Sequence, residues 1–230
     1  MPKPIKKKVL KKTTSEIEVK GVISKLKESA AKRKSSLTAA ISAFLVAAFA
    51  VAGFFIYNNN QKSSVQKLEY DGYKMYYGLY QKQPVTKEEQ YKRAADTFKK
   101  AYDTRKSPVS LFYIANCYYE TGKYDDALKT LKELNQKFPD DERFVPLSYY
   151  KMALANLRKG NSAEALNSLD ILYKYKTGTF KDISLFESVK ILESLGRIEE
   201  AKRKYEELKK DFPESPFIEE AEVKAGEKKS

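Results

Sequence analysis

Few side chains in this sequence have the chemistry that catalysis or metal binding requires. The chain contains no histidine, and Cys117 is its only cysteine, so an imidazole base, an intramolecular disulfide and a zinc site of His and Cys ligands are excluded. Two acidic pairs, Asp125 with Asp126 and Glu199 with Glu200, have the residue type for acid–base catalysis. Each pair stands at a predicted helix start, where exposed carboxylates offset the helix dipole. We therefore predict that the chain is not an enzyme and uses no cofactor or metal ion.

Both acidic pairs belong to a pattern that repeats along the C-terminal part of the chain. Three glycines are each followed five residues later by an alanine, and then by larger residues four and three positions further on. The glycines are Gly122, Gly160 and Gly196, and the alanines are Ala127, Ala165 and Ala201. Ala94 begins the same spacing without a glycine before it, and the four alanines are separated by 33, 38 and 36 residues. A period of about 34 residues, with two helices joined at a glycine, predicts a helical solenoid.

Each recurrent residue has a physical reason in such helix pairs. Glycine provides the left-handed backbone that ends the first helix, and alanine lets the second helix pack close to the first. Pro139 and Pro213 end the second helix, because proline cannot continue it. Pro216 begins a last amphipathic segment, with Phe217 and Ala221 on its apolar side. We therefore predict an all-α fold with an α-solenoid of about four helix pairs, closed by a C-terminal capping helix.

The stretch from Leu111 to Pro139 resembles a tetratricopeptide repeat. The residues that match the motif are Ile114, Ala115, Tyr118, Gly122, Tyr124, Ala127, Leu131 and Pro139. Later units match less fully, because Asn156 stands where the motif prefers an aromatic residue, and Ser188 and Leu192 replace its usual apolar and tyrosine residues. The resemblance covers residues 66–226. It implies the fold and not one function, since such repeats serve many partners.

In this family the first helix of each pair lines a groove that holds a peptide or a partner helix. Carried onto this sequence, the resemblance implies a partner-binding groove lined by Phe112, Asn116, Tyr119, Tyr150, Leu154, Leu157, Phe186 and Lys190. Few of these side chains are charged, which favours an extended or helical apolar ligand. The carboxylate clamp of some members is not expected, because only Asn116 matches it and Phe112 departs from it. Packing between repeats is the alternative interpretation of each side chain, and we favour it for the tyrosines from Tyr70 to Tyr80.

A second feature is the run from Leu37 to Tyr57, which holds 21 residues without a charge. As a helix it is about 32 Å long, enough to cross a hydrocarbon core of about 30 Å. The apolar run of a cleaved signal peptide is shorter, and its cleavage site follows that run. We therefore predict an uncleaved transmembrane helix at 37–57.

Charge is distributed unevenly on the two sides of this run. The net charge is +13, of which residues 1–36 hold +9 and residues 58–230 hold +4. Basic residues beside a span remain in the cytoplasm, so we predict a cytoplasmic arm at 1–36, a polar linker at 58–65 and an extracytoplasmic repeat domain at 66–230. The arm would also attract anionic lipid, whereas no nucleic-acid-binding module accompanies its charge. From Ser15 onwards it forms either an amphipathic helix on the membrane or a solvated tail.

The layout of arm, span and repeat domain resembles the bacterial ancillary subunit of the Sec translocon (the YfgM-like group). The resemblance implies a single-pass protein of the inner membrane whose periplasmic domain meets secreted chains or periplasmic chaperones. One alternative is a periplasmic scaffold for envelope assembly or division, of the Tol-Pal or outer-membrane assembly type. The run from Phe212 to Pro216 resembles the ends of the repeats in such scaffolds. Another alternative assigns the function to the basic arm, as an adaptor for anionic lipid or nucleic acid.

Overall fold

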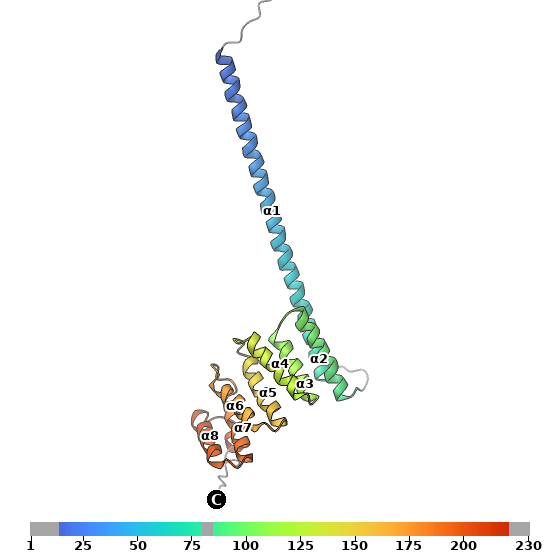
Figure 1. Cartoon of the computed structure of the whole chain (residues 1–230), viewed down its shortest axis with the longest axis vertical. Helices are drawn as coiled ribbons and strands as arrows, with labels where there is room; N and C mark the ends of the chain where they lie inside the picture. Colours follow the sequence, from blue (N-terminus) through green and yellow to red (C-terminus); the bar gives the residue numbers. More distant parts are fainter. Residues whose placement is uncertain (1–13, 80–84, 221–230) are drawn as a thin grey trace, which may run out of the picture. The chain divides into compact units, whose positions relative to one another are not determined.

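The computed structural model of the chain describes residues 14–79 and 85–220, with the side chains in these ranges except those of residues 14–19, 30, 34 and 35. Most of the predicted cap from Ala221 onwards, and the side chain of Ser15, lie outside the described part. Within it the main elements are eight α-helices, and no strand is present (Figure 1). They are α1 (Thr14–Tyr76), α2 (Lys87–Thr104), α3 (Pro108–Glu120), α4 (Tyr124–Lys137), α5 (Phe144–Arg158), α6 (Ser162–Lys174), α7 (Lys181–Ser194) and α8 (Ile198–Asp211). The chain divides into two units, residues 1–59 and 60–230.

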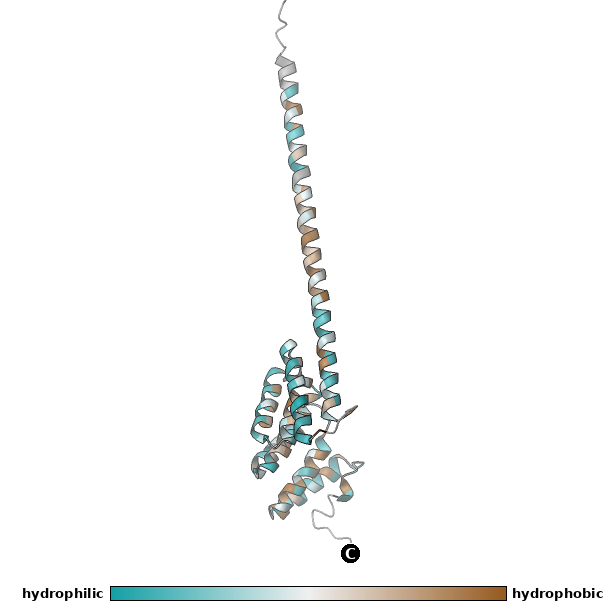
Figure 2. Cartoon of the chain, turned by 90° about the vertical axis from the view of Figure 1, so that its right-hand side faces the viewer, coloured by the Kyte–Doolittle hydropathy of each residue, from teal (hydrophilic) through white to brown (hydrophobic). Residues whose placement is uncertain are grey.

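Helix α1 contains the uncharged run from Leu37 to Tyr57. Large apolar side chains of this run are exposed, Phe44 by 74% and Phe49 by 76%. Figure 2 shows an apolar band within α1, with hydrophilic residues on both sides of it. By length and composition α1 is therefore a candidate for crossing a membrane. The helix begins at Thr14, so the predicted arm helix forms part of it.

The segment 58–65 differs from its prediction as a linker, because it is a continuous part of α1. Asparagine and serine cost a helix only about 0.5 kcal/mol each, and no glycine or proline interrupts the chain between Phe54 and Asp71. Val65 is already in the core, with 5% of its surface exposed. Packing of the repeat unit therefore begins inside the predicted linker.

The second unit consists of four consecutive helix pairs, as the repeat predicts. The end of α1 pairs with α2, where Gly72 faces Phe98 and Gln90 donates to the carbonyl of Tyr76. Helix α3 pairs with α4, α5 with α6, and α7 with α8. Each new first helix also packs on the pair before it, since α2 contacts α3, α4 contacts α5 and α6 contacts α7. This arrangement confirms the predicted all-α repeat fold.

Glycine ends three of the first helices. Gly122, Gly160 and Gly196 have φ angles of 74°, 77° and 71°, the left-handed backbone that the sequence predicted. The backbone amide of the residue after each glycine donates to the carbonyl of the residue four positions before that glycine. Lys123 N, for example, donates to Tyr118 O at 2.8 Å. These bonds pair backbone groups that the end of a helix would leave without partners.

The first pair depends on two further glycines. Gly78 follows α1 and has a φ angle of 67°, so the first pair also turns at a glycine. The sequence pattern had assigned no turn glycine to the pair that contains Ala94. Gly72 faces the ring of Phe98 on α2, and a Cβ atom there would lie 2.9 Å from that ring. The missing side chain therefore allows α2 to approach α1 closely.

The repeated alanines and prolines act as predicted. Ala94, Ala127, Ala165 and Ala201 have no exposed surface, which places each second helix directly against its first helix. Helix α4 ends at Lys137, two residues before Pro139, and α8 ends at Asp211, two residues before Pro213. Spacing in the sequence therefore predicts where three of the pairs turn and where two of them end.

Candidate binding surfaces

The predicted groove residues lie on the first helices of three pairs, and we call this surface the first-helix face. Helix α3 carries Phe112, Asn116 and Tyr119, α5 carries Tyr150, Leu154 and Leu157, and α7 carries Phe186 and Lys190. Asn116 and Phe186 are buried, and the other six residues are half-buried. The sequence therefore places these residues on equivalent helices, but their access to solvent differs.

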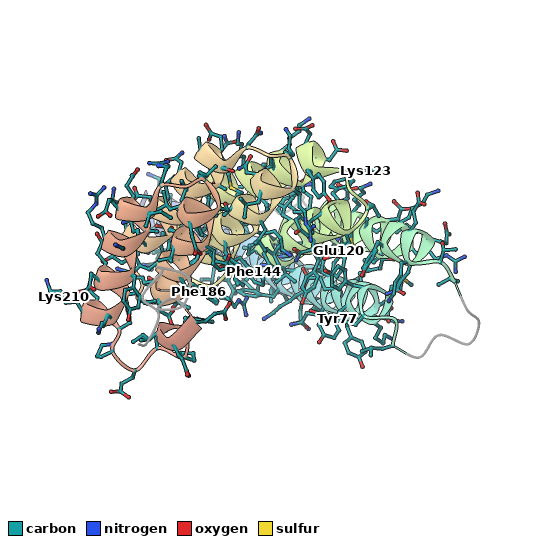
Figure 3. The ribbon with its side chains drawn as sticks, turned by 90° about the horizontal axis from the view of Figure 1, so that it is seen from below. Tyr77, Glu120, Lys123, Phe144, Phe186 and Lys210 are labelled. Carbon is teal, nitrogen blue, oxygen red and sulfur yellow. The ribbon has the colours of Figure 1, made fainter. Side chains whose placement is uncertain are left out.

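Two phenylalanines of this face are covered by a ring from the chain that follows their own helix pair. The ring of Phe112 lies 5.4 Å from that of Phe144, and the ring of Phe186 stacks on that of Phe217 at 4.9 Å. In the view of Figure 3, Phe144 and Phe186 lie over the middle of the molecule, whereas Lys210 lies at its margin. Phe112 therefore packs between repeats, and Phe186 packs against the segment that follows the last pair.

Tyr150 packs against the apolar cluster of α5, α6 and α7. Phe180, the residue directly before α7, packs against the same cluster. Phe180 has a φ angle of 66°, a left-handed conformation that bulky residues rarely adopt. Burial, with help from the charge of Glu187, raises the pKa of the Tyr150 hydroxyl.

Asn116 is the buried polar residue of the first-helix face. Only 5% of its surface is exposed, and its Oδ1 atom has no hydrogen-bond partner in the described part of the chain. A buried acceptor without a donor costs about 1–3 kcal/mol.

Tyr119 contacts two cations of α5 that the sequence prediction missed. Arg158 Nε donates to the Tyr119 hydroxyl at 3.2 Å, and Lys151 Nζ lies 4.6 Å from the centre of the ring. Burial lowers the pKa of Lys151, an effect that Glu120 partly offsets. Lys151, Leu154 and Arg158 are spaced by three and four residues, so helical spacing from Leu154 would have found both cations.

The remaining predicted residues have partners within their own repeats. Lys190 pairs with Glu187 at 3.1 Å, and its Nζ lies 4.9 Å from the ring of Phe186. Leu157 packs against the apolar cluster of α5 and α6. The structure therefore gathers Tyr119, Lys151 and Arg158 at one place, and leaves Lys190 in a separate contact on α7.

Cavities lie on the side of the second helices, and none of the eight predicted residues lines the three that form between consecutive repeats. A cavity of about 180 Å³ lies between α2 and α3, one of about 840 Å³ between α4 and α6 over α5, and one of about 160 Å³ between α6 and α8 over α7. Sequence reasoning missed all three, because each one forms between consecutive repeats.

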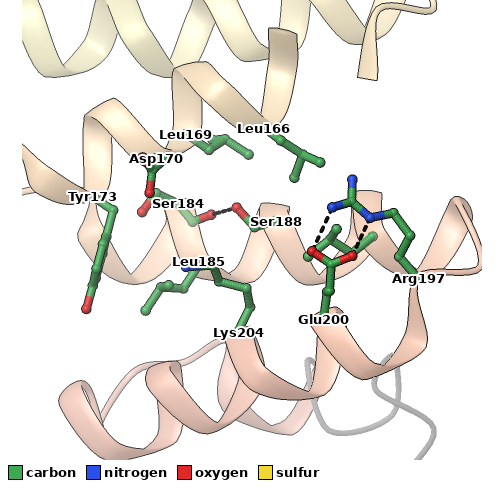
Figure 4. Close-up of a pocket in the computed structure, with 11 residues that line it drawn as sticks. Leu166, Leu169, Asp170, Tyr173, Ser184, Leu185, Ser188, Arg197, Glu200 and Lys204 are labelled. Atoms are coloured by element: carbon green, nitrogen blue, oxygen red, sulfur yellow. Dashed lines mark hydrogen bonds and ion pairs between the residues drawn. The ribbon is translucent and has the colours of Figure 1, made fainter. Parts of the chain in front are cut away.

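The cavity beside α8 is lined by apolar and internally paired groups (Figure 4). The hydroxyls of Ser184 and Ser188 donate to backbone carbonyls at 2.6 and 2.7 Å. At the rim, Arg197 donates two hydrogen bonds of 2.6 Å to Glu200. The cavity has room for about one benzene-sized group.

The largest of these three cavities is an open groove with amide and lysine side chains. We call it the α4–α6 groove; Lys129, Lys132 and Gln136 line it from α4, Asn156 from α5 and Asn167 from α6. Asn156 is 7% exposed, so its side chain lies at the floor of the groove. The groove therefore offers hydrogen-bonding groups on all three helices.

The described residues contain no cluster suited to a metal ion, and their single thiol is buried. No group of three or more His, Cys, Asp or Glu residues comes together in the ranges 14–79 and 85–220. Cys117 is 2% exposed, and burial raises the pKa of its thiol to about 12. A thiol with this pKa is a poor nucleophile at neutral pH.

Comparison with known proteins agrees with this geometry. Residues 86–157 and residues 184–215 each match a family model described as tetratricopeptide repeat. No curated protein matches the chain. Two solved structures are similar to this chain: the nearly identical TPR-like repeats of a protein described as a kinesin light chain from Podosopora anserina, and a variant of those repeats. Each has 13% identity and a TM-score of 0.47, and the match covers 74% of this chain and 87% of that chain. The chain therefore contains tetratricopeptide repeats at residues 86–157 and 184–215, the type of repeat used for binding other proteins.

Proposed function

We propose that this chain is a single-pass membrane protein whose repeat domain binds protein segments next to the membrane. The basic residues 1–36 lie in the cytoplasm, and the repeat domain lies in the periplasm of a bacterial cell. There the domain receives segments of secreted chains close to the Sec translocon, or passes them to periplasmic chaperones. This role requires binding and no catalysis.

The observation that carries the proposal is the exposed run from Leu37 to Tyr57. Its side chains are apolar, uncharged and uncovered by any described part of the chain, with Phe44 and Phe49 more than two thirds exposed. Apolar surface of this extent marks a binding or membrane surface. The charge of +9 before the run against +4 after it supports the cytoplasmic position of the N-terminal side.

The part of the first-helix face between α3 and α5 supports protein binding. Asn116 has an unpaired carbonyl oxygen, and Tyr119 offers its ring beside Lys151 and Arg158. Leu154 is half-buried on the same side of α5. The half-buried side chains of Tyr119 and Leu154 fit a segment that supplies an apolar side chain.

Membrane anchoring is tested with two lysines placed in the apolar run. The double variant Val46→Lys with Phe49→Lys should move the protein into the soluble fraction after alkaline extraction, since each charge at a helix centre costs about 3 kcal/mol of insertion. The matched control, Val22→Lys with Leu26→Lys, should stay in the membrane fraction. If both double variants remain in the membrane, the run does not anchor the chain.

Orientation and partner are tested in cells. Protease added to spheroplasts should digest the repeat domain, and protection of that domain would contradict the proposed orientation. A photoreactive phenylalanine derivative at Tyr119 should capture translocon subunits, secreted chains or periplasmic chaperones, while the same group at Lys100 of α2 provides the background. Specific capture of envelope-assembly proteins instead would identify a scaffold and contradict the secretion role.

A further inference from the structure

The α4–α6 groove has a small polar residue, Asn156, at its floor. Tyr118, Asn156 and Leu192 each stand four residues before a turn glycine, so they occupy equivalent places in three pairs. Where the residue is Tyr118 or Leu192 the cavity is about 180 or 160 Å³, and at Asn156 it is about 840 Å³. The exchange of an aromatic residue for asparagine therefore accompanies a cavity of the size that ligand sites have.

Asn156 faces this groove with its side-chain amide. It is 7% exposed and lines the cavity, and its side-chain amide makes no hydrogen bond within the described residues. Gln136 and Asn167 line the same groove, and their amides likewise make no hydrogen bond there. A carboxamide both donates and accepts hydrogen bonds, which matches the N–H and C=O groups of a polypeptide main chain.

The charges of the groove favour an acidic partner. Two of the carboxylates that line it are neutralised internally, Asp125 by Lys159 and Glu133 by Lys137. Lys129 and Lys132 have no ion-pair partner among the residues that the structure describes, and Glu164 is the lining carboxylate without one. Two cations are thus available to a partner against one anion.

We propose that the α4–α6 groove binds an extended acidic segment of a polypeptide. The three carboxamides pair with its main chain, and Lys129 and Lys132 pair with its carboxylates. Leu128, Met152 and Ile171 provide apolar contacts between these polar groups. This surface is distinct from the first-helix face, so the domain can hold two different segments at once.

The test measures peptide binding by fluorescence anisotropy, using the full chain in a non-ionic detergent. The probe is a labelled peptide in which Ser-Glu-Ile is repeated three times, and its counterpart carries lysine in place of glutamate. The Asn156→Tyr variant restores an aromatic floor and should weaken binding of the acidic peptide at least about tenfold. Lys129→Glu combined with Lys132→Glu should weaken it by a similar factor.

A matched variant separates the groove from general charge. Lys100→Glu combined with Lys210→Glu makes the same change in net charge on exposed residues that line none of the described cavities, and it should bind as the unchanged protein does. Equal weakening by both lysine pairs, unchanged binding by Asn156→Tyr, or equal affinity for the basic peptide would overturn the proposal. If single-stranded DNA binds more strongly than the acidic peptide and the same groove variants lose that binding, the ligand is a nucleic acid. This result would also refute the proposal. Circular dichroism melting of each variant shows whether it is folded, and an unfolded Asn156→Tyr is replaced by Asn156→Leu.

Discussion

The rings of Phe186 and Phe217 stack with their centroids 4.9 Å apart and an angle of 12° between their planes. Phe186 belongs to α7 and is 4% exposed, while Phe217 follows α8 and packs against the same apolar cluster. Ser215, two residues earlier, donates to Asp182 at the start of α7 at 3.0 Å. The chain after α8 therefore packs on the last helix pair through Phe217 and Ser215, while most of the predicted cap lies outside the described residues.

Removing the ring of Phe217 should destabilise this last pair. For Phe217→Ala we expect a loss of about 2 kcal/mol in the free energy of unfolding, since a half-buried ring leaves its contact surface open. Urea titration of the full chain in detergent measures it. Leu195→Ala, which removes a 45% exposed side chain from the neighbouring turn, serves as the control and should change the free energy by less than about 0.5 kcal/mol. Equal effects would show that Phe217 does not hold the cap.

A side chain at Gly72 should separate α1 from α2. The Cβ atom of Gly72→Ala would lie 2.9 Å from the buried ring of Phe98, so the ring or the helix must move. We expect a loss of about 1–3 kcal/mol in the free energy of unfolding. Gly178→Ala is the matched control, because a Cβ atom there meets nothing within 4 Å. A neutral Gly72→Ala would contradict the close packing.

The turn at Gly196 tests backbone conformation apart from packing. A Cβ atom at this position meets nothing within 4 Å, but φ is +71°. Gly196→Ala should therefore cost about 1 kcal/mol of unfolding free energy through the left-handed conformation alone. Gly196→Asn should cost less, because asparagine tolerates that conformation better. The ranking Gly, Asn, Ala in thermal midpoint checks the expectation, and an inverted ranking would contradict it.

The thiol of Cys117 should be protected in the folded chain. Its burial and its pKa of about 12 leave little thiolate at pH 8. We expect disulfide exchange with an aromatic disulfide reagent to be at least about a hundredfold slower than in urea-unfolded chain. Rapid reaction under native conditions would show that α2 and α3 open readily.

The hydrogen bond between Tyr173 and Asp211 should make the free energy of unfolding depend on pH in the alkaline range. The Tyr173 hydroxyl donates to Asp211 at 2.8 Å, and this hydrogen bond raises the pKa of Tyr173 to about 12. Because the folded pKa lies above the unfolded value of 10.0, the stabilisation is complete below pH 10 and is lost as the pH rises towards 12.

The difference in unfolding free energy between the unchanged protein and Tyr173→Phe measures this linkage. It should favour tyrosine at pH 8 and shrink between pH 10 and 12. The other tyrosines contribute equally to both proteins and cancel in the comparison. A difference that stays constant over this range would show that the bond to Asp211 contributes nothing to stability.

Local patterns in the sequence determined the helix pairs. A turn glycine such as Gly122, a buried alanine such as Ala127 and a stop such as Pro139 act through the backbone and through contacts within one pair, so their spacing is sufficient to predict them. The uncharged run from Leu37 to Tyr57 is equally visible, because it depends only on composition and length.

The tertiary structure decided what happens between pairs. Which aromatic ring covers Phe186, whether Lys151 reaches Tyr119, and how much space Asn156 leaves over α5 all depend on side chains that meet only after consecutive repeats pack. Such contacts join residues about 30 or more positions apart, and no local spacing encodes them. The sequence therefore determined the architecture of the repeat domain, while packing between repeats decided which of its surfaces remain open to a partner.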